Sequence, residues 1–357
     1  MNKKSILILM TVLMLLTALG VAYRVITKEP EAEKYDNLHT LLPGMEISAL
    51  FDDGDRIWAG TGDGIYLLDR ATGETVRKLD TDIHMIYSAM ITRSYDGLIW
   101  VGHEDGLSAF DSSFKEVMRI TAPAIPEGRV NTLLAVDDGL WAGSQNGAAH
   151  LCIKDDAWTV DEILTKDTGL AEDVVQVIEK VGDELWFGAY LSQDKGGISI
   201  LSENGWSYLN TDDGIPHSYI NAILPLSDDE VLIGSGQMMY GGLSHVMKQD
   251  GKWKISFNLD QSNGIPGMKI RTLFLDSAGR LFITTETDGL ILLNSPDELN
   301  ATPLNGTVIK QENGLADNEI KCIIECESCY FLGGKYGLTR WDKQIIKKDM
   351  IRTLKQT

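Results

Sequence analysis

Basic side chains are scarce in this chain, in which 32 lysine and arginine residues stand against 52 aspartate and glutamate residues. The formal net charge is −20 at pH 7. A surface with such an excess of negative charge repels the phosphate backbone of nucleic acids. We therefore expect no nucleic acid among the partners of this protein.

Residues with dedicated chemistry are also few, with six histidines and four cysteines. The histidines show no spacing typical of a metal site. No paired carboxylates, nucleophile–base set or cofactor motif recurs at matched positions along the chain. We therefore expect no catalytic residues, no metal ion and no cofactor, which favours a binding protein over an enzyme and leaves the enzymatic alternative open.

Three of the four cysteines form the motif Cys322-x3-Cys326-x2-Cys329, a spacing that also occurs in proteins with an iron–sulfur cluster. The internal repeat described below argues against a cluster, because Ile320 to Phe331 aligns without gaps on Ile47 to Trp58. The alignment places Cys326 and Cys329 on either side of a two-residue turn. The sequence thus predicts either a disulfide across a hairpin or two free thiols.

A long uncharged stretch occurs at the N-terminus, from Ser5 to Tyr23, directly after Lys3 and Lys4. A basic segment followed by an apolar run is typical of an export signal, and this run is just long enough to span a bilayer. Residues 1–27 are therefore predicted to form a hydrophobic helix that acts as a signal peptide or as a signal anchor. Residues 28–42 form a polar tether, and residues 43–357 are expected outside the cytoplasm.

The most informative feature of the remaining chain is a phrase that occurs seven times: an apolar strand, a turn, a Trp-Φ-Gly strand and a Gly-Φ strand. The large apolar residue of the second strand recurs every 41 to 50 residues. These seven anchors are Trp58, Trp100, Trp141, Trp186, Leu232, Phe282 and Phe331. A repeat of about 40–50 residues made of short strands is typical of a β-propeller. The sequence thus predicts an all-β, seven-bladed β-propeller with four antiparallel strands per blade over residues 43–357.

The first blade illustrates the expected construction, with strands a to d at residues 47–51, 56–61, 64–68 and 75–79. The inner strands a and b are nearly continuous apolar runs, which is typical of strands buried on both faces. The bulky anchor of strand b is expected to fill the space between neighbouring blades. The glycine that follows this anchor is expected to let the chain turn where a side chain would clash.

Two segments compete to close the ring. Residues 35–42 align with the run that precedes strand a of the fifth blade, and they qualify as the last outer strand. Residues 344–349 resemble residues 307–312 of the sixth blade and qualify equally. The repeat leaves both alternatives open.

Two recurring phrases carry a resemblance to a known family. The segments Asp213-Gly-Ile-Pro and Asn263-Gly-Ile-Pro precede strand a, and Leu-Trp-Φ-Gly strands such as Leu140–Gly143 follow. This pattern resembles the two-component regulator propeller repeat over Pro43 to about Asp342. The resemblance implies an extracytoplasmic sensor domain, with a membrane or envelope protein such as a sensor kinase as a partner.

Irregular loop lengths indicate where a ligand would bind. The distance from the anchor to the start of strand c is seven residues in blade 1, from Trp58 to Ile65, but 12 in blade 4 and 11 in blade 5. In a propeller the b–c and d–a loops share one face, so the extra residues gather on one side. The candidate ligand-binding residues on this face are Tyr190, Gln193, Gln237, Met239, Tyr240, His217, Tyr219, Arg129, Lys269 and His103.

These features favour a non-catalytic binding or sensor propeller whose ligand is a small solute, a glycan fragment or a protein partner. One alternative is an enzyme that resembles virginiamycin B lyase or the quinoprotein propellers, with its chemistry at the mouth of the channel. In that case His103 and Glu104, expected on a loop, would be the first candidates for a base. A second alternative is a scaffold in an envelope assembly, because the fold alone does not decide the function.

Overall fold

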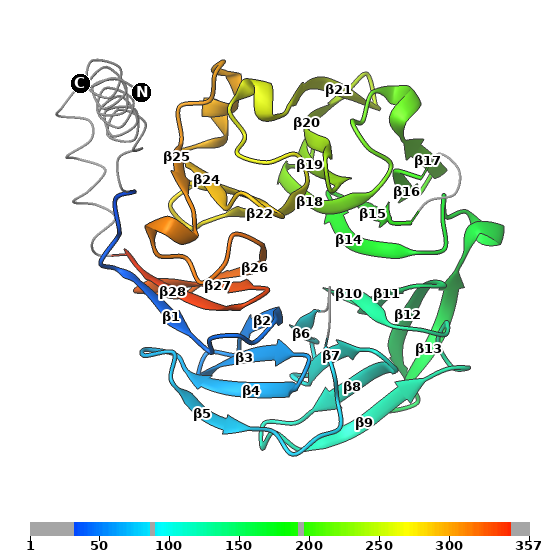
Figure 1. The fold of residues 1–357 in the computed structure, drawn as a ribbon. Coiled ribbons are helices and arrows are strands. Elements are labelled where there is room, and N and C mark those ends of the chain that lie inside the picture. Colours follow the sequence, from blue (N-terminus) through cyan, green and yellow to red (C-terminus); the bar gives the residue numbers. More distant parts are fainter. Residues whose placement is uncertain (1–31, 86–89, 192–195, 344–357) are drawn as a thin grey trace, which may run out of the picture. The chain divides into compact units, whose positions relative to one another are not determined.

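The computed structural model describes residues 32–85, 90–191 and 196–343. Within the unit Tyr35–Thr357, seven four-stranded antiparallel sheets stand as blades around a common centre (Figure 1). The predicted seven-bladed β-propeller with four antiparallel strands per blade is confirmed. The hydrophobic helix predicted within residues 1–27 lies outside the described residues. In the part of the chain that the structure describes, no helix has the length and hydrophobicity needed to span a membrane.

Blades 1 to 6 each consist of four consecutive strands, of which the first lies at the centre of the ring and the last at its rim. The strands of blades 1 to 3 are β2 (Ile47–Asp52), β3 (Arg56–Thr61), β4 (Gly64–Asp69), β5 (Thr75–Lys78), β6 (Ile91–Arg93), β7 (Ile99–His103), β8 (Gly106–Phe110), β9 (Glu116–Thr121), β10 (Val130–Val136), β11 (Gly139–Ser144), β12 (Gly147–Lys154) and β13 (Ala157–Leu164). The strands of blades 4 to 6 are β14 (Val175–Val181), β15 (Glu184–Ala189), β16 (Ile198–Ser202), β17 (Gly205–Leu209), β18 (Ile220–Ser227), β19 (Glu230–Gln237), β20 (Tyr240–Gln249), β21 (Lys252–Leu259), β22 (Ile270–Leu275), β23 (Leu281–Thr285), β24 (Leu290–Leu293) and β25 (Thr307–Ile309).

Blade 7 joins the two ends of the propeller. Its inner strands are β26 (Ile320–Glu325), β27 (Cys329–Gly334) and β28 (Gly337–Asp342), and its outer strand is β1 (Leu38–Leu41). The register pairs Leu38 with Trp341 and Leu41 with Leu338. The N-terminal segment therefore closes the ring, and the competing segment 344–349 lies outside the described residues.

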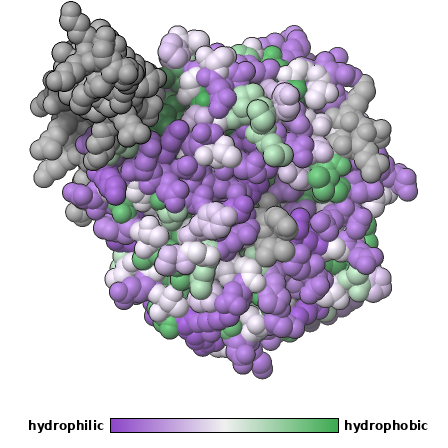
Figure 2. Space-filling model, in the orientation of Figure 1, coloured by the Kyte–Doolittle hydropathy of each residue, from purple (hydrophilic) through white to green (hydrophobic). Residues whose placement is uncertain are grey.

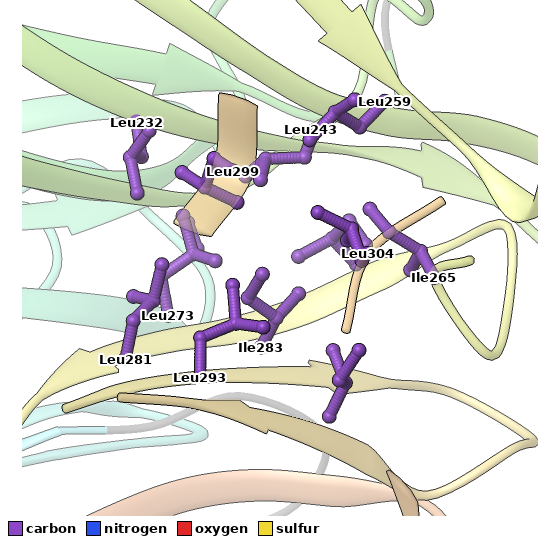
Figure 3. Close-up of a cluster of buried hydrophobic side chains, with 13 residues drawn as sticks. Leu232, Leu243, Leu259, Ile265, Leu273, Leu281, Ile283, Leu293, Leu299 and Leu304 are labelled. Carbon is purple, nitrogen blue, oxygen red and sulfur yellow. The ribbon is translucent and has the colours of Figure 1, made fainter. Parts of the chain in front are cut away.

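The buried apolar side chains of the described residues form seven clusters, and each cluster fills the space between two neighbouring blades. Figure 3 shows the one between blades 5 and 6, where Leu232 and Leu243 of blade 5 face Leu281 and Leu293 of blade 6. All seven strand-b anchors are buried, and the exposed fraction of their side chains does not exceed 4%. The predicted role of the anchors is thus confirmed, including the positions where Leu or Phe replaces Trp.

The glycine that follows the anchor in every blade but the sixth, which has Thr284, has a different role from the one predicted. Gly188 lies inside β15 and does not adopt a positive φ, so the chain does not turn there. A Cβ atom at Gly188 would lie 2.9 Å from Cγ2 of Ile220, the first residue of the next inner strand. Gly143 and Gly234 meet Val175 and Ile270 in the same way. The expectation of a turn was wrong, because the glycine makes room for the next blade instead.

The segment that links one blade to the next consists, in four places, of a short 3-10 helix followed by a glycine. The helices are η1 (Lys166–Thr168), η2 (Thr211–Asp213), η3 (Gln261–Asn263) and η5 (Gln311–Asn313), and a further one, η4 (Pro296–Asn300), lies within blade 6. The glycines that follow the first four have φ between 106° and 132°, a region that favours glycine over other residues. This turn leads the chain from the rim of one blade to the centre of the next.

Candidate functional site

A β-bulge at the start of the inner strand in six of the seven blades builds the mouth of the central channel. In blades 1, 3, 4, 5 and 7 the pairing of strands a and b skips the second residue of strand a, and in blade 6 it skips two residues. A bulge re-aims the side chain of the extra residue. The bulged residues are polar in all six blades: Ser48, Asn131, Gln176, Asn221, Arg271 with Thr272, and Lys321.

These residues line a central cavity of about 320 Å³. Deeper in the cavity the walls are mostly apolar, with Leu50, Ile223, Phe274 and Ile324 among the lining side chains. The volume lies at the lower end of the range for pockets that bind small molecules. The channel can therefore hold a small solute below a hydrogen-bonding rim.

An aromatic cluster lies beside this mouth on the b–c and d–a face. The rings of Tyr190 and Tyr219 have centroids 4.7 Å apart, and those of Tyr219 and His217 are 4.8 Å apart in an edge-on arrangement. Tyr190 follows β15, and its backbone N–H donates to the carbonyl of Val174 over 2.9 Å. All three rings are half-buried, so their positions are defined while part of each surface stays accessible.

Lys269 adds a positive charge to this cluster. Its Nζ lies 5.8 Å from the ring centroid of Tyr190 and 2.8 Å from Oε1 of Glu286. Burial, and to a lesser extent the charge of Lys269, lowers the pKa of His217. The Nδ1 atom of the neutral imidazole accepts the backbone N–H of Tyr219 over 3.0 Å, which leaves Nε2–H as a donor. The cluster thus offers aromatic faces, a cation and a donor.

The extra residues of blade 5 form a projecting hairpin arm instead of the predicted loop. Strands β19 and β20 continue to the pair Gln237–Tyr240, and Met238 and Met239 form the turn. The exposed fractions of Met238, Met239 and Tyr240 are 72%, 75% and 73%. The arm begins beside the aromatic cluster, because the N–H of Gly236 donates to the carbonyl of Tyr219 over 2.9 Å.

The remaining candidates do not join this cluster. Nε of Arg129 donates to Oδ1 of Asn131 over 2.9 Å, on the blade 3 side of the channel. The structure places His103 at the end of β7 and not on a loop, and only 1% of it is exposed. Burial first, and then the charge of Arg119, lowers the pKa of His103 to about 4. Gln193 lies outside the described residues.

The cysteines form the predicted hairpin. The N–H of Cys326 donates to the carbonyl of Cys329 over 2.8 Å, and both side chains are buried. Burial raises the pKa of Cys322, which lines the channel, to about 12. The disulfide between Cys326 and Cys329 stays a prediction. Within the described ranges, no group of three or more His, Cys, Asp or Glu side chains could hold a metal ion.

Sequence reasoning missed the channel residues. A signal was present, because one polar residue follows the first apolar residue of an otherwise apolar strand in Ile47-Ser48, Ile220-Asn221, Ile270-Arg271 and Ile320-Lys321. Regular alternation would place this residue between blades. The bulge that turns it toward the channel has no signal in a single repeat.

Comparison with known proteins gives structural neighbours only. No family model matches the chain, and no curated protein matches it either. The extracellular domain of an inferred hybrid two component system from B. thetaiotaomicron superposes with a TM-score of 0.69 at 17% identity, over 87% of this chain and 41% of that one. The corresponding domain of a second such system from this bacterium has a TM-score of 0.65 at 20% identity, over 87% and 40%.

Virginiamycin B lyase from Staphylococcus aureus also shares the fold, with a TM-score of 0.59 at 14% identity over 85% of this chain and 98% of the lyase. The chain spans about two fifths of the length of the two extracellular domains. At these identities the likeness extends to the fold alone. The chain therefore has the β-propeller fold of these extracellular domains of two component systems, the group of proteins that its repeats resemble.

Proposed function

We propose that this chain is a non-catalytic binding propeller that acts outside the cytoplasm as a sensor module. Its ligand would be a glycan fragment or a similar small solute, bound on the b–c and d–a face. The observation that carries this proposal is the cluster beside the channel mouth, in which the half-buried rings of His217, Tyr219 and Tyr190 lie next to the buried Lys269. The fold shared with extracellular domains of inferred two-component sensors supports the sensor role.

The chemistry of the cluster suits a carbohydrate. Tyrosine rings offer flat apolar faces on which the C–H faces of a sugar can pack, and their hydroxyl groups bond to sugar hydroxyls. Lys269 and the Nε2–H group of neutral His217 supply donors at fixed positions. Because the packing of Tyr190 against Tyr219 orders both rings before binding, little side-chain entropy is lost on association.

The exposed arm supports a role in holding the ligand or a partner. Met239 and Tyr240 expose large apolar surfaces that a soluble protein keeps small unless they are used. A protein partner, such as a sensor kinase or another envelope protein, would bind this arm instead of the aromatic cluster. Separate substitutions in the arm and in the aromatic cluster distinguish binding of a partner from binding of a small ligand.

The test is a thermal-shift screen of the purified chain against a panel of oligosaccharides, followed by titration calorimetry with the best ligand. Tyr190→Ala and Tyr219→Ala are each expected to weaken binding by about tenfold or more. Tyr336→Ala is the matched control, because Tyr336 is 58% exposed in the turn between β27 and β28 of blade 7. Equal affinity of all three variants would contradict the proposed site.

The enzymatic alternative is weakened by one residue. His103, the first candidate for a base, is 1% exposed and its Nε2 lies 3.1 Å from Oγ of Ser108. A base must reach the proton that it abstracts, and a histidine enclosed in β7 does not reach the channel mouth. Although the chain shares its fold with virginiamycin B lyase, His103 is therefore not placed to act as a catalytic base.

A further inference from the structure

Glu179 is an ionisable residue at a depth of the channel where the other blades place uncharged residues. Its Cα pairs with that of Trp186, the strand-b anchor of blade 4. The residues opposite the other six anchors are Phe51, Thr92, Leu134, Leu224, Phe274 and Ile324. Because apolar residues fill this position in five blades, the fold does not require a carboxylate there.

Among the residues that the structure describes, the strands packed most closely against β14 place no positive charge next to Glu179. Strands β10, β11 and β18 surround β14 and contain no ionisable side chain. On β15 the charged residue is Glu184, whose Oε1 accepts from Lys248 over 3.0 Å. On β14 itself Lys180 is exposed, and strand alternation directs it away from Glu179.

The two basic residues of the channel lining already have acidic partners at the mouth. Nη2 of Arg271 lies 3.1 Å from Oε1 of Glu319, and Nζ of Lys321 forms an ion pair with Glu46. Glu179 is three residues further along β14 than Gln176, about 10 Å deeper at the usual rise of a strand. The deep part of the channel therefore holds an acidic side chain with no basic side chain of the described lining paired to it.

Three buried polar atoms near the mouth also form no hydrogen bond with the described residues. Oγ of Ser48, Oδ1 of Asn221 and Nε of Arg271 are buried and have no hydrogen-bond partner among the described residues. Ser48 is only 3% exposed and lines the same cavity as Glu179. Buried polar atoms are normally satisfied by protein, water or a ligand. Two levels of the cavity thus offer unused polar groups.

We propose that the channel is a binding site for a small organic cation, such as a primary amine, whose charged group pairs with the carboxylate of Glu179. The apolar walls at Leu50, Ile223 and Phe274 contact the hydrocarbon part, and the groups at the mouth bind a polar substituent. This site goes beyond the rim site proposed above and does not depend on it.

A proton balance makes the site testable without knowledge of the natural ligand. Burial raises the pKa of Glu179 to about 7, so about half of the carboxyl groups are protonated at pH 7. A bound cation favours the carboxylate, and the proton is released to the buffer. We therefore expect n-butylammonium to release up to about half a proton per molecule bound at pH 7 and almost none at pH 9.

The experiment is titration calorimetry of the full chain with n-butylammonium in phosphate and in HEPES buffer, whose ionisation enthalpies differ and neither of which contains a primary amine. Butan-1-ol, which has nearly the same shape and no charge, is expected to bind without proton release. Glu179→Gln is expected to weaken n-butylammonium binding about tenfold and to abolish the proton release. Glu203→Gln, which removes an exposed carboxylate from blade 4, should change neither.

Three results would overturn the proposal: no binding of n-butylammonium up to about 50 mM, binding by the wild type without proton release at pH 7, or equal affinities of Glu179→Gln and Glu203→Gln. The wild-type proton count needs no variant, so it decides the question even where Glu179→Gln fails to fold. Tyr190→Ala should bind n-butylammonium normally. A failure of the rim site and a failure of the channel site are thus distinguished.

Discussion

At the scale of single residues, Glu179 illustrates how a binding group stores free energy in the unliganded protein. A carboxylate within apolar walls loses hydration, and burial raises its pKa from 4.5 to about 7. The protein keeps this group in a place where an apolar residue would stabilise the fold. A ligand that supplies the missing positive charge recovers the lost free energy, which is how binding is favoured over an empty channel.

The same residue makes stability depend on pH in a defined direction. Between about pH 4.5 and pH 7 the folded protein retains the proton that the unfolded chain releases. The contribution of Glu179 to the free energy of unfolding therefore falls as pH rises through this window and is constant above it. Glu179→Gln lacks this dependence. We expect the variant to exceed the wild type by about 1–3 kcal/mol at pH 8, the lower values reflecting water in the channel, and to match it near pH 4.5.

Urea denaturation of both proteins at pH 4.5, 6 and 8 measures this difference, in which the contributions of all other titrating groups cancel. The control is Glu203→Gln, which removes the same charge from an exposed turn and should shift stability equally at each pH. A difference between Glu179→Gln and the wild type that stays constant with pH would show that Glu179 is not desolvated.

At the scale of secondary-structure elements, most strands were predictable because each blade repeats one pattern. Strands a, b and c of blade 1 were expected at residues 47–51, 56–61 and 64–68, and the structure has β2, β3 and β4 within one residue of these bounds. Two features were not predictable. The bulge at Ser48 is set by pairing with β3, and the arm at Met238 and Met239 extends a ladder where a loop was expected. Both depend on contacts between strands, which the order of residues does not reveal.

Ring closure was undecided for the same reason. Residues 35–42 and 344–349 both have a strand-like pattern, and only the partner strand distinguishes them. The structure pairs β1 with β28 and buries Leu38 between blades 6 and 7, where it joins Ile309 and Tyr330. The N–H of Tyr35 also donates to the carbonyl of Asn313 over 2.9 Å. The closing strand thus has both a ladder and a hydrophobic contact.

The closing strand gives a prediction at this scale. Leu38→Asp places a charge in the cluster between blades 6 and 7 and is expected to lower the free energy of unfolding by about 2–4 kcal/mol. Thr40→Asp, at an exposed position of the same strand, should change it by less than about 0.5 kcal/mol. Hydrogen exchange is expected to accelerate in β28 of Leu38→Asp, because its outer ladder opens. Unchanged exchange in β28 would mean that β1 does not close the ring.

At the scale of the whole molecule, the propeller is a closed set of seven interfaces. Each hydrophobic cluster joins one blade to the next, and the cluster containing Ile47, Leu50 and Phe331 joins blade 7 to blade 1. Separation of two blades would expose both sides of a cluster, yet the rest of the ring would still hold the blades in place. Little conformational entropy is gained by such an opening, so local separation is disfavoured. The outer surface, by contrast, is mainly hydrophilic on the face shown in Figure 2, in agreement with the net charge of −20.

The aromatic cluster and Glu179 lie in the same part of the propeller. Tyr190 follows β15 of blade 4, Tyr219 precedes β18 of blade 5, and Glu179 lies on β14, the innermost strand of blade 4. The interface between blades 4 and 5 therefore supports both proposed sites. If the ring unfolds as one cooperative unit, a change in the packing of this interface affects the stability of both sites together.

Gly188→Ala tests whether it does. The added Cβ would lie 2.6 Å from Cγ1 of Val177 and 2.9 Å from Cγ2 of Ile220, which forces blades 4 and 5 apart. We expect a loss of about 1–3 kcal/mol, as for other overpacked cores. Because the ring is closed, calorimetry should show a single transition at a lower Tm and not an early transition of two blades. The double variant Gly188→Ala/Val177→Ala should lose less than the sum of the single changes, since Val177→Ala removes the nearest clashing atom. A separate low-temperature transition would show that the blades unfold independently and that the two sites are not held by the ring as a whole.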